Sequence, residues 1–209
     1  MTSSGMAAVR HFKRVDPIFH AATKRHHSSL PARLAEKRTK YALFESLVST
    51  VISKQLGMAA ADTIFARVKQ SCGGKITVDS VLKTRDAKLR LAGLSGAKTK
   101  TLKSIATAIQ NGELDLIALK KMPEQDAAEK LMRIWGLGPW SVEMFMMFAL
   151  GREDVFSAGD LGLVRAMETI YGLSKNFPRE NILKIAQAWS PYRTYACLLL
   201  WRSRDTKAD

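Results

Sequence analysis

Apolar residues recur every three or four positions along most of the chain. In residues 41–52 this spacing places Leu43, Leu47, Val48 and Val51 on one face, and residues 59–68, 98–110 and 123–134 continue the pattern. Because an α-helix repeats every 3.6 residues, we predict an amphipathic helix in each stretch. Residues 141–150 and 193–202 are apolar nearly all round, which predicts central buried helices.

Signals for β-strands are scarce. Only residues 75–78 alternate in the way a strand requires, and that stretch is short. Signals for the ends of helices are clearer, since Asn111 and Gly112 follow one predicted helix and Pro123 begins another. A chain of 209 residues can bury one good core or two small lobes. The pattern therefore predicts an all-α fold.

Positive charge is concentrated in two regions. The formal net charge is +14. Residues 1–40 carry nine basic and two acidic residues, and residues 75–103 carry eight and two. Either run alone is typical of a solvated surface. Together they favour a polyanionic partner, and nucleic acid is the first candidate.

Several functional classes fit the composition poorly. The longest unbroken apolar run, residues 144–150, is far shorter than the roughly 20 residues of a membrane-spanning helix. The first residues lack the apolar core of a secretory signal. Cys72 and Cys197 are the only cysteines, and all four histidines precede residue 28. We therefore expect no export, no membrane association, and no zinc or iron–sulfur centre.

The most specific local feature is LMRIWGLGPWSV, residues 131–142. Gly136 and Gly138 permit a tight turn between two helices. Pro139 at the start of the second helix leaves the neighbouring N–H groups available to an anion. An ordinary corner between helices would show the same pattern. The alternative of a phosphate-binding hairpin gains weight only from its surroundings.

A second feature is an acidic residue beside a glycine, in DVFSAGDLGLVRA, residues 154–166. Asp160 precedes another predicted helix, so its carboxylate could serve only as an N-cap. That is the default interpretation of a lone aspartate, and only the surrounding motifs favour a reactive carboxylate.

Taken in order, these features resemble the helix-hairpin-helix DNA glycosylases, specifically the 3-methyladenine DNA glycosylase II branch. The resemblance covers most of residues 41–204. Besides the hairpin and its aspartate, it includes VISKQLGMAAA at 51–61, LAGLSGAK at 91–98 and PYRTYACLLLW at 191–201. It implies two helical lobes with a DNA-binding cleft between them.

The resemblance also implies a role for each matching residue. Asp160 would be the catalytic carboxylate, and Trp140 would line the base pocket. Gln55, or Leu56 if the register differs by one, would wedge into the duplex. Other DNA-binding residues would be Lys54, Gly57, Gly136, Gly138 and Ser141. The backbone carbonyls of Met132, Ile134 and Leu137 would hold a monovalent cation, Na⁺ or K⁺, and no other cofactor is expected.

The implied reaction is hydrolysis of the N-glycosidic bond of flipped-out alkylated bases such as 3-methyladenine and 7-methylguanine. Relatives that also cut the strand carry a nucleophilic lysine where this chain has Trp140, so lyase activity is not expected. The expected partner is double-stranded DNA that contains alkylated bases or abasic sites, bound by a monomer. The location would be the nucleus of a eukaryote, or otherwise the cytoplasm or nucleoid.

Three positions depart from the family pattern. Lys54 replaces a glutamine, Gly57 replaces a serine, and Ser157 replaces a proline that would stiffen the turn before Asp160. These changes leave open an alternative to the leading hypothesis, a glycosylase-like protein that binds abasic or distorted DNA with weak excision or none. A third hypothesis is a basic helical protein that binds DNA without regard to damage.

Some assignments concern packing and organisation. Residues 1–40 are predicted to form a basic arm and first helix, and residues 41–209 the glycosylase domain, with the hairpin at 127–150. Trp135, Trp189 and Trp201 are interpreted as core residues, as are the methionines near residue 146. Arg193 could contact a phosphate or form an internal salt bridge.

Overall fold

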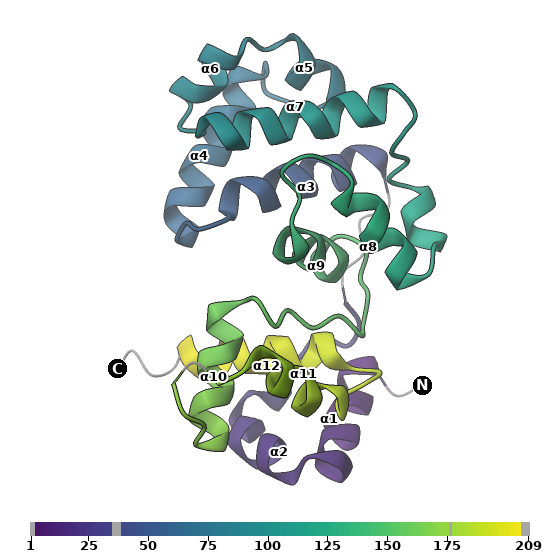
Figure 1. Cartoon of the computed structure of the whole chain (residues 1–209), viewed down its shortest axis with the longest axis vertical. Helices are drawn as coiled ribbons and strands as arrows, with labels where there is room; N and C mark the ends of the chain where they lie inside the picture. The colour runs from purple at the N-terminus through teal and green to yellow at the C-terminus, as the bar shows by residue number, and fades with distance from the viewer. Residues whose placement is uncertain (1–2, 35–38, 176, 206–209) are drawn as a thin grey trace. The chain divides into compact units, whose positions relative to one another are not determined.

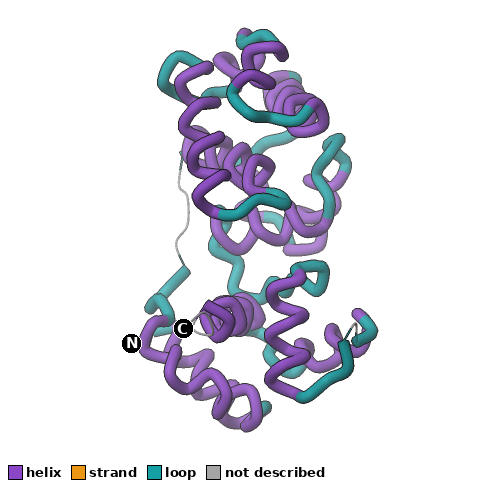
Figure 2. Tube along the Cα trace, turned by 90° about the vertical axis from the view of Figure 1, so that its left-hand side faces the viewer, coloured by secondary structure: helices purple, strands orange, loops and turns teal. Residues whose placement is uncertain are grey.

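The computed structural model describes residues 3–34, 39–175 and 177–205. In these ranges every regular element is helical and no strand occurs (Figure 2), which confirms the predicted all-α class. None of the described helices is long and apolar enough to cross a lipid bilayer. The chain forms two compact units, one built from both ends of the chain and one from its middle.

The first unit contains the described residues before 35 and after 150. Its elements are α1 (Ser4–Val15), α2 (Pro17–Thr23), the 3₁₀ helix η1 (Lys24–Ser29), α10 (Leu161–Tyr171), α11 (Arg179–Gln187) and α12 (Arg193–Asp205) (Figure 1). Helix α12 packs against α1, α2, η1 and α10. Its apolar residues Leu199 and Leu200 are fully buried, as the sequence predicts.

An aromatic and polar cluster fastens the amino-terminal helices into this unit. Phe19 of α2 stacks on Trp189 with ring centroids 4.6 Å apart. The Asp16 carboxylate caps α2 through the Phe19 amide and accepts hydrogen bonds from the Tyr171 hydroxyl and, at 2.9 Å, the Trp189 indole. Burial and the Asp16 carboxylate strongly raise the pKa of Tyr171. The phenol therefore remains a hydrogen-bond donor at any ordinary pH.

The division of the chain differs from the predicted boundary at residue 40. The described residues 3–34 pack into the first unit and do not extend as an arm, because Ala8, Phe12 and Phe19 are fully buried there. Charge alone suggested a solvated segment. Helices α1 and α2 instead pack on each other and against α10 and α12, which lie well over 100 positions later. Local sequence does not reveal this pairing.

The second unit contains the described residues from 39 to 150. Its elements are α3 (Lys40–Ser53), α4 (Met58–Ser71), α5 (Val78–Lys83), α6 (Asp86–Leu91), α7 (Gly96–Gln110), the 3₁₀ helix η2 (Ala118–Lys121), α8 (Glu124–Met132) and α9 (Pro139–Phe148). Helix α3 packs against α4, α7 and α9, with Leu43, Leu47 and Val48 fully buried. The strand-like residues at 75–78 lead into α5 instead.

Candidate active site

The segment that leads to Asp160 is tied to the start of α12 by side-chain hydrogen bonds. The Thr194 hydroxyl donates to the Arg152 carbonyl at 2.7 Å and accepts from the Val155 amide at 3.0 Å. Thr194 is fully buried, so water does not compete for these bonds. The segment is therefore anchored before it reaches Asp160.

An ion pair strengthens this anchor. Arg193 donates from Nε to Oδ1 of Asp154 at 2.8 Å and from Nη2 to Oδ2 at 3.0 Å, and Ser190 Oγ adds a bond to Oδ2 at 2.7 Å. Partial burial opposes ionisation of Asp154, but the bonds from Arg193 and Ser190 and the guanidinium charge outweigh it and lower the pKa. Of the two roles considered for Arg193, the structure shows the internal salt bridge.

Ser157 lies where the resemblance predicts a proline. It is fully buried, and its carbonyl accepts the Asp160 amide at 3.1 Å in the last turn before α10. Tertiary packing thus restrains a turn that a proline would restrain through its ring.

Asp160 is the N-cap of α10 and has a second partner. Its Oδ1 accepts the Leu163 amide at 3.0 Å and the Trp201 indole Nε1–H at 3.1 Å. A Cβ atom on Gly162 would lie 2.9 Å from that oxygen and 3.3 Å from the Trp201 ring. Glycine at 162 therefore lets the carboxylate and the indole approach. Trp201 is only partly buried, so its interpretation as a core residue misses this contact.

The predicted hairpin is present in the second unit. Helix α8 ends at Met132 and α9 begins at Pro139 after the extended N-cap Gly138. Gly136 has φ +85°, and a Cβ there would lie 2.0 Å from Thr101 Oγ1. This position requires glycine both for its backbone angle and for its close contact with α7.

The residues that follow Pro139 differ in exposure. Trp140 is partly buried, whereas Ser141 is 1% exposed. The Ser141 side chain is therefore hidden, and its expected contact with DNA could be made only by the backbone amide in the first turn of α9.

The hairpin carbonyls fit the chemistry of a monovalent cation. Ile134 O accepts the Leu137 amide at 3.1 Å. Among the described residues, no backbone amide donates to the carbonyls of Met132 or Leu137. These oxygens are the ligand type that Na⁺ and K⁺ prefer.

The predicted wedge residues form an exposed turn between α3 and α4. Gln55 has φ +61°, which is unusual for a residue with a side chain. Leu56 is 38% exposed, and Gly57 is the N-cap of α4 with open space around its Cα. Of the two wedge candidates, Leu56 is thus the one with an exposed apolar side chain, the type that proteins insert between base pairs.

Sequence reasoning missed the residue that supports this turn. Lys98 in the first turn of α7 donates from Nζ to the carbonyls of Ile52 and Lys54, both at 2.8 Å. It thereby caps the carboxyl end of α3. Partial burial, and then the charge of Lys54, lower the pKa of Lys98. The segment LAGLSGAK at 91–98 contains this lysine, but the local sequence does not reveal that it reaches the end of α3.

Trp135 also differs from expectation. It is 47% exposed on the hairpin turn, and Lys100 Nζ lies 4.2 Å from the centre of its ring. Of the three tryptophans assigned to the core, only Trp189 is fully buried. The spacing of Trp135 followed the apolar face of α8, but that helix ends three residues earlier.

Comparisons with known proteins agree with this geometry. The profile of the HhH-GPD superfamily of base excision DNA repair proteins matches residues 48–191. A DNA-3-methyladenine glycosylase 1 from Schizosaccharomyces pombe is 35% identical over 179 residues, which cover 83% of this chain and 76% of that protein.

Solved structures show the same fold. The 3-methyladenine DNA glycosylase of S. pombe, in complex with abasic DNA, superimposes with a TM-score of 0.84 at 31% identity, covering 94% of this chain and 95% of that one. A DNA-3-methyladenine glycosidase from Bacillus halodurans gives 0.74 at 34% identity, covering 93% and 91%. With its hairpin, its capped aspartate and these matches, the chain belongs to the HhH-GPD superfamily of base excision DNA repair proteins.

Proposed function

We propose that this protein is a monofunctional DNA glycosylase that hydrolyses the N-glycosidic bond of alkylated bases flipped out of double-stranded DNA. The observation that carries the proposal is the Asp160 carboxylate, held by the Leu163 amide and the Trp201 indole. The names of the S. pombe and B. halodurans relatives support the substrate class. A net charge of +14 supports DNA as the partner.

The chemistry requires little acid catalysis. An alkylated purine is cationic, so it leaves as a neutral base that takes the electron pair of the C1′–N bond. Positive charge then develops on the deoxyribose, and the Asp160 carboxylate stabilises it. A water molecule forms the new C1′–O bond, and Asp160 accepts its proton. Trp140 is proposed to stack on the cationic base.

The remaining assignments follow the same proposal. The amides after Pro139 would bind a DNA phosphate, and the carbonyls of Met132, Ile134 and Leu137 would hold Na⁺ or K⁺, whose charge would favour that phosphate. The wedge residue would fill the space left by the extruded nucleotide. The absence of a lysine at position 140 supports hydrolysis without strand cleavage.

The experiment is single-turnover base release from duplexes that contain 3-methyladenine or 7-methylguanine, with wild type and Asp160→Asn in parallel. Asparagine is as good an N-cap as aspartate, so the variant is expected to fold and to bind abasic duplex as wild type does. Its release rate should fall at least about 100-fold. The same reactions, resolved without alkaline treatment, report strand cleavage.

The outcomes separate the hypotheses. Release by wild type and none by the variant supports the enzyme. If both proteins bind abasic duplex tightly and neither releases a base, the enzyme hypothesis is rejected in favour of the damage-binding alternative. Equal affinity for damaged and undamaged duplexes without release would leave only general DNA binding.

A further inference from the structure

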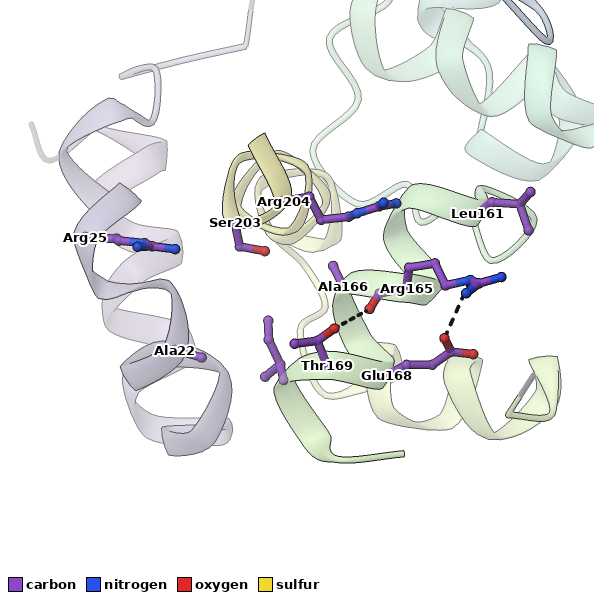
Figure 3. Close-up of a pocket in the computed structure, with 10 residues that line it drawn as sticks. Ala22, Arg25, Leu161, Arg165, Ala166, Glu168, Thr169, Ser203 and Arg204 are labelled. Atoms are coloured by element: carbon purple, nitrogen blue, oxygen red, sulfur yellow. Dashed lines mark hydrogen bonds and ion pairs between the residues drawn. The ribbon is translucent and has the colours of Figure 1, made fainter. Parts of the chain in front are cut away.

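A broad groove lies entirely within the first unit. It has a volume of about 930 Å³ and is lined by residues of α2, η1, α10 and α12 (Figure 3). Its charged lining combines three arginines with one carboxylate: Arg25, Arg165, Arg204 and Glu168. No part of the proposed reaction uses this groove.

The three arginines come from three different elements. Arg25 belongs to η1, Arg165 to α10 and Arg204 to the last turn of α12, and all three are exposed. In Figure 3, Arg165 and Arg204 extend on the same side of the groove, and Arg25 lies on the opposite side. Residues so far apart in sequence make this positive surface a product of the tertiary fold.

The guanidinium groups keep most of their donors available. Among the described residues, Arg165 has one ionic contact, from Nε to Glu168 Oε2 at the long distance of 3.7 Å. Toward the described part of the chain, Arg25 donates from Nε to His26 Nε2 at 3.0 Å. Arg204 has no hydrogen bond or ion pair with any described side chain. Donors arranged in this way suit the oxygens of phosphate groups.

The groove begins beside the proposed catalytic residue. Leu161 lines it, directly follows Asp160 and is 74% exposed. Arg165 lies one helical turn further along α10, and Arg204 lies three residues after Trp201, the partner of Asp160. A DNA strand whose nucleotide is held at Asp160 has neighbouring phosphates within a few ångströms along its backbone.

We propose that this groove binds the phosphodiester backbone of the DNA strand next to the nucleotide held at Asp160. This inference rests on the proposed function, because it takes Asp160 as the position of the extruded nucleotide. The contacts are electrostatic and read no base. They anchor the flanking strand on the first unit while the nucleotide is extruded.

The test is equilibrium binding of a duplex that carries a stable abasic-site analogue, measured as a function of salt. The double variant Arg165→Gln/Arg204→Gln removes two guanidiniums. We expect the slope of log K against log salt to fall by about 2, since each phosphate contact contributes about 0.9. We expect affinity at low salt to fall about tenfold or more.

Two control variants keep the result interpretable. Arg179→Gln removes one positive charge, half of what the double variant loses, from the first turn of α11, outside the groove, and should bind as wild type does. Arg165→Lys/Arg204→Lys keeps the charge and should keep the salt slope. An unchanged slope and affinity in the glutamine double variant would overturn the proposal. A loss in Arg179→Gln of about half the size seen in the double variant would also overturn it, because the effect would then scale with net charge alone.

Duplexes shortened on one side of the analogue locate the contact. With one of the two arms shortened, wild type and the double variant should bind equally, because the phosphates that fill the groove are gone. A difference that persists with either arm shortened would contradict binding of one flanking strand.

The failure of this inference is distinguishable from failure of the proposed function. Base release by wild type, together with unchanged binding by the groove variant, would reject the groove alone. Absence of base release, together with weaker binding by the groove variant, would reject the enzyme and retain the groove as a DNA contact.

Discussion

The indole Nε1 of Trp201 donates to Oδ1 of Asp160 at 3.1 Å, joining residues 41 positions apart. The Leu163 amide reaches the same oxygen from within α10. One donor is thus set by the local helix start and the other by the packing of α12 on α10. Together they fix the rotation of the carboxylate, which a cap alone would leave less defined.

Replacement of Trp201 by phenylalanine should slow base release without weakening DNA binding. Phenylalanine keeps the ring and removes the N–H that holds Oδ1. We expect the single-turnover rate to fall about tenfold, as for loss of one bond to a charged group, with unchanged affinity for abasic duplex. A parallel loss of affinity and thermal stability would instead indicate a purely structural role.

Replacement of Gly136 by alanine should destabilise the second unit. The new Cβ would meet Thr101 Oγ1 at 2.0 Å in a backbone with φ +85°. Such strain costs about 1–3 kcal/mol, and affinity for duplex DNA should fall because the turn must shift. Chemical denaturation followed by circular dichroism measures the change in unfolding free energy.

Gly138 provides the matched control for this prediction. Its φ is −99°, and a Cβ there would meet nothing within 4 Å. The free energy of unfolding of Gly138→Ala should therefore lie within about 0.5 kcal/mol of the wild-type value. Equal destabilisation by the two substitutions would contradict the assignment of strain to Gly136.

Substitutions in the wedge turn should distinguish Leu56 from Gln55. Leu56→Ala removes an exposed apolar side chain, and we expect excision of a base in fully paired duplex to slow about tenfold or more. Excision from a duplex with a mismatch at the lesion should slow less, because less pairing must be broken. Gln55→Gly should relieve the backbone at φ +61° and raise stability slightly. A larger loss of excision in Gln55→Ala than in Leu56→Ala would assign the wedge to Gln55.

The Asp154–Arg193 pair should contribute stability that disappears in acid. The pKa of Asp154 is lowered in the folded protein, so the folded state holds this proton less tightly than the unfolded state does. Its contribution is present above the unfolded value near 3.8 and is lost as the pH falls through the lower folded value. Wild type should melt several degrees above Asp154→Asn at pH 6, and this difference should shrink below pH 4. A difference independent of pH would mean that ionisation of Asp154 does not stabilise the segment.

Much of the site could be predicted from local sequence because local geometry governs it. The G-x-G-P turn between α8 and α9 and the N-cap at Asp160 both depend on residues within one helical turn. The helices can be predicted for the same reason, since the spacing of apolar residues decides which face of each helix is buried. Arg193 shows what local sequence cannot predict. The sequence allows either a phosphate contact or an internal salt bridge, and only the position of Asp154, 39 residues away, decides between them.

Alone, the sequence determined the all-helical class, the hairpin, the position of Asp160 and, through the order of its motifs, the family. Only the tertiary structure decided that the two ends of the chain fold together, that Trp201 and Gly162 frame Asp160, that Lys98 caps α3, and that three distant arginines line one groove. The physical reason is the distance along the chain over which each interaction acts. Helix propensity, capping and turn geometry act over a few residues and are written in the order of the chain. Burial and side-chain pairing depend on which surfaces meet, and that is settled by the packing of the whole unit.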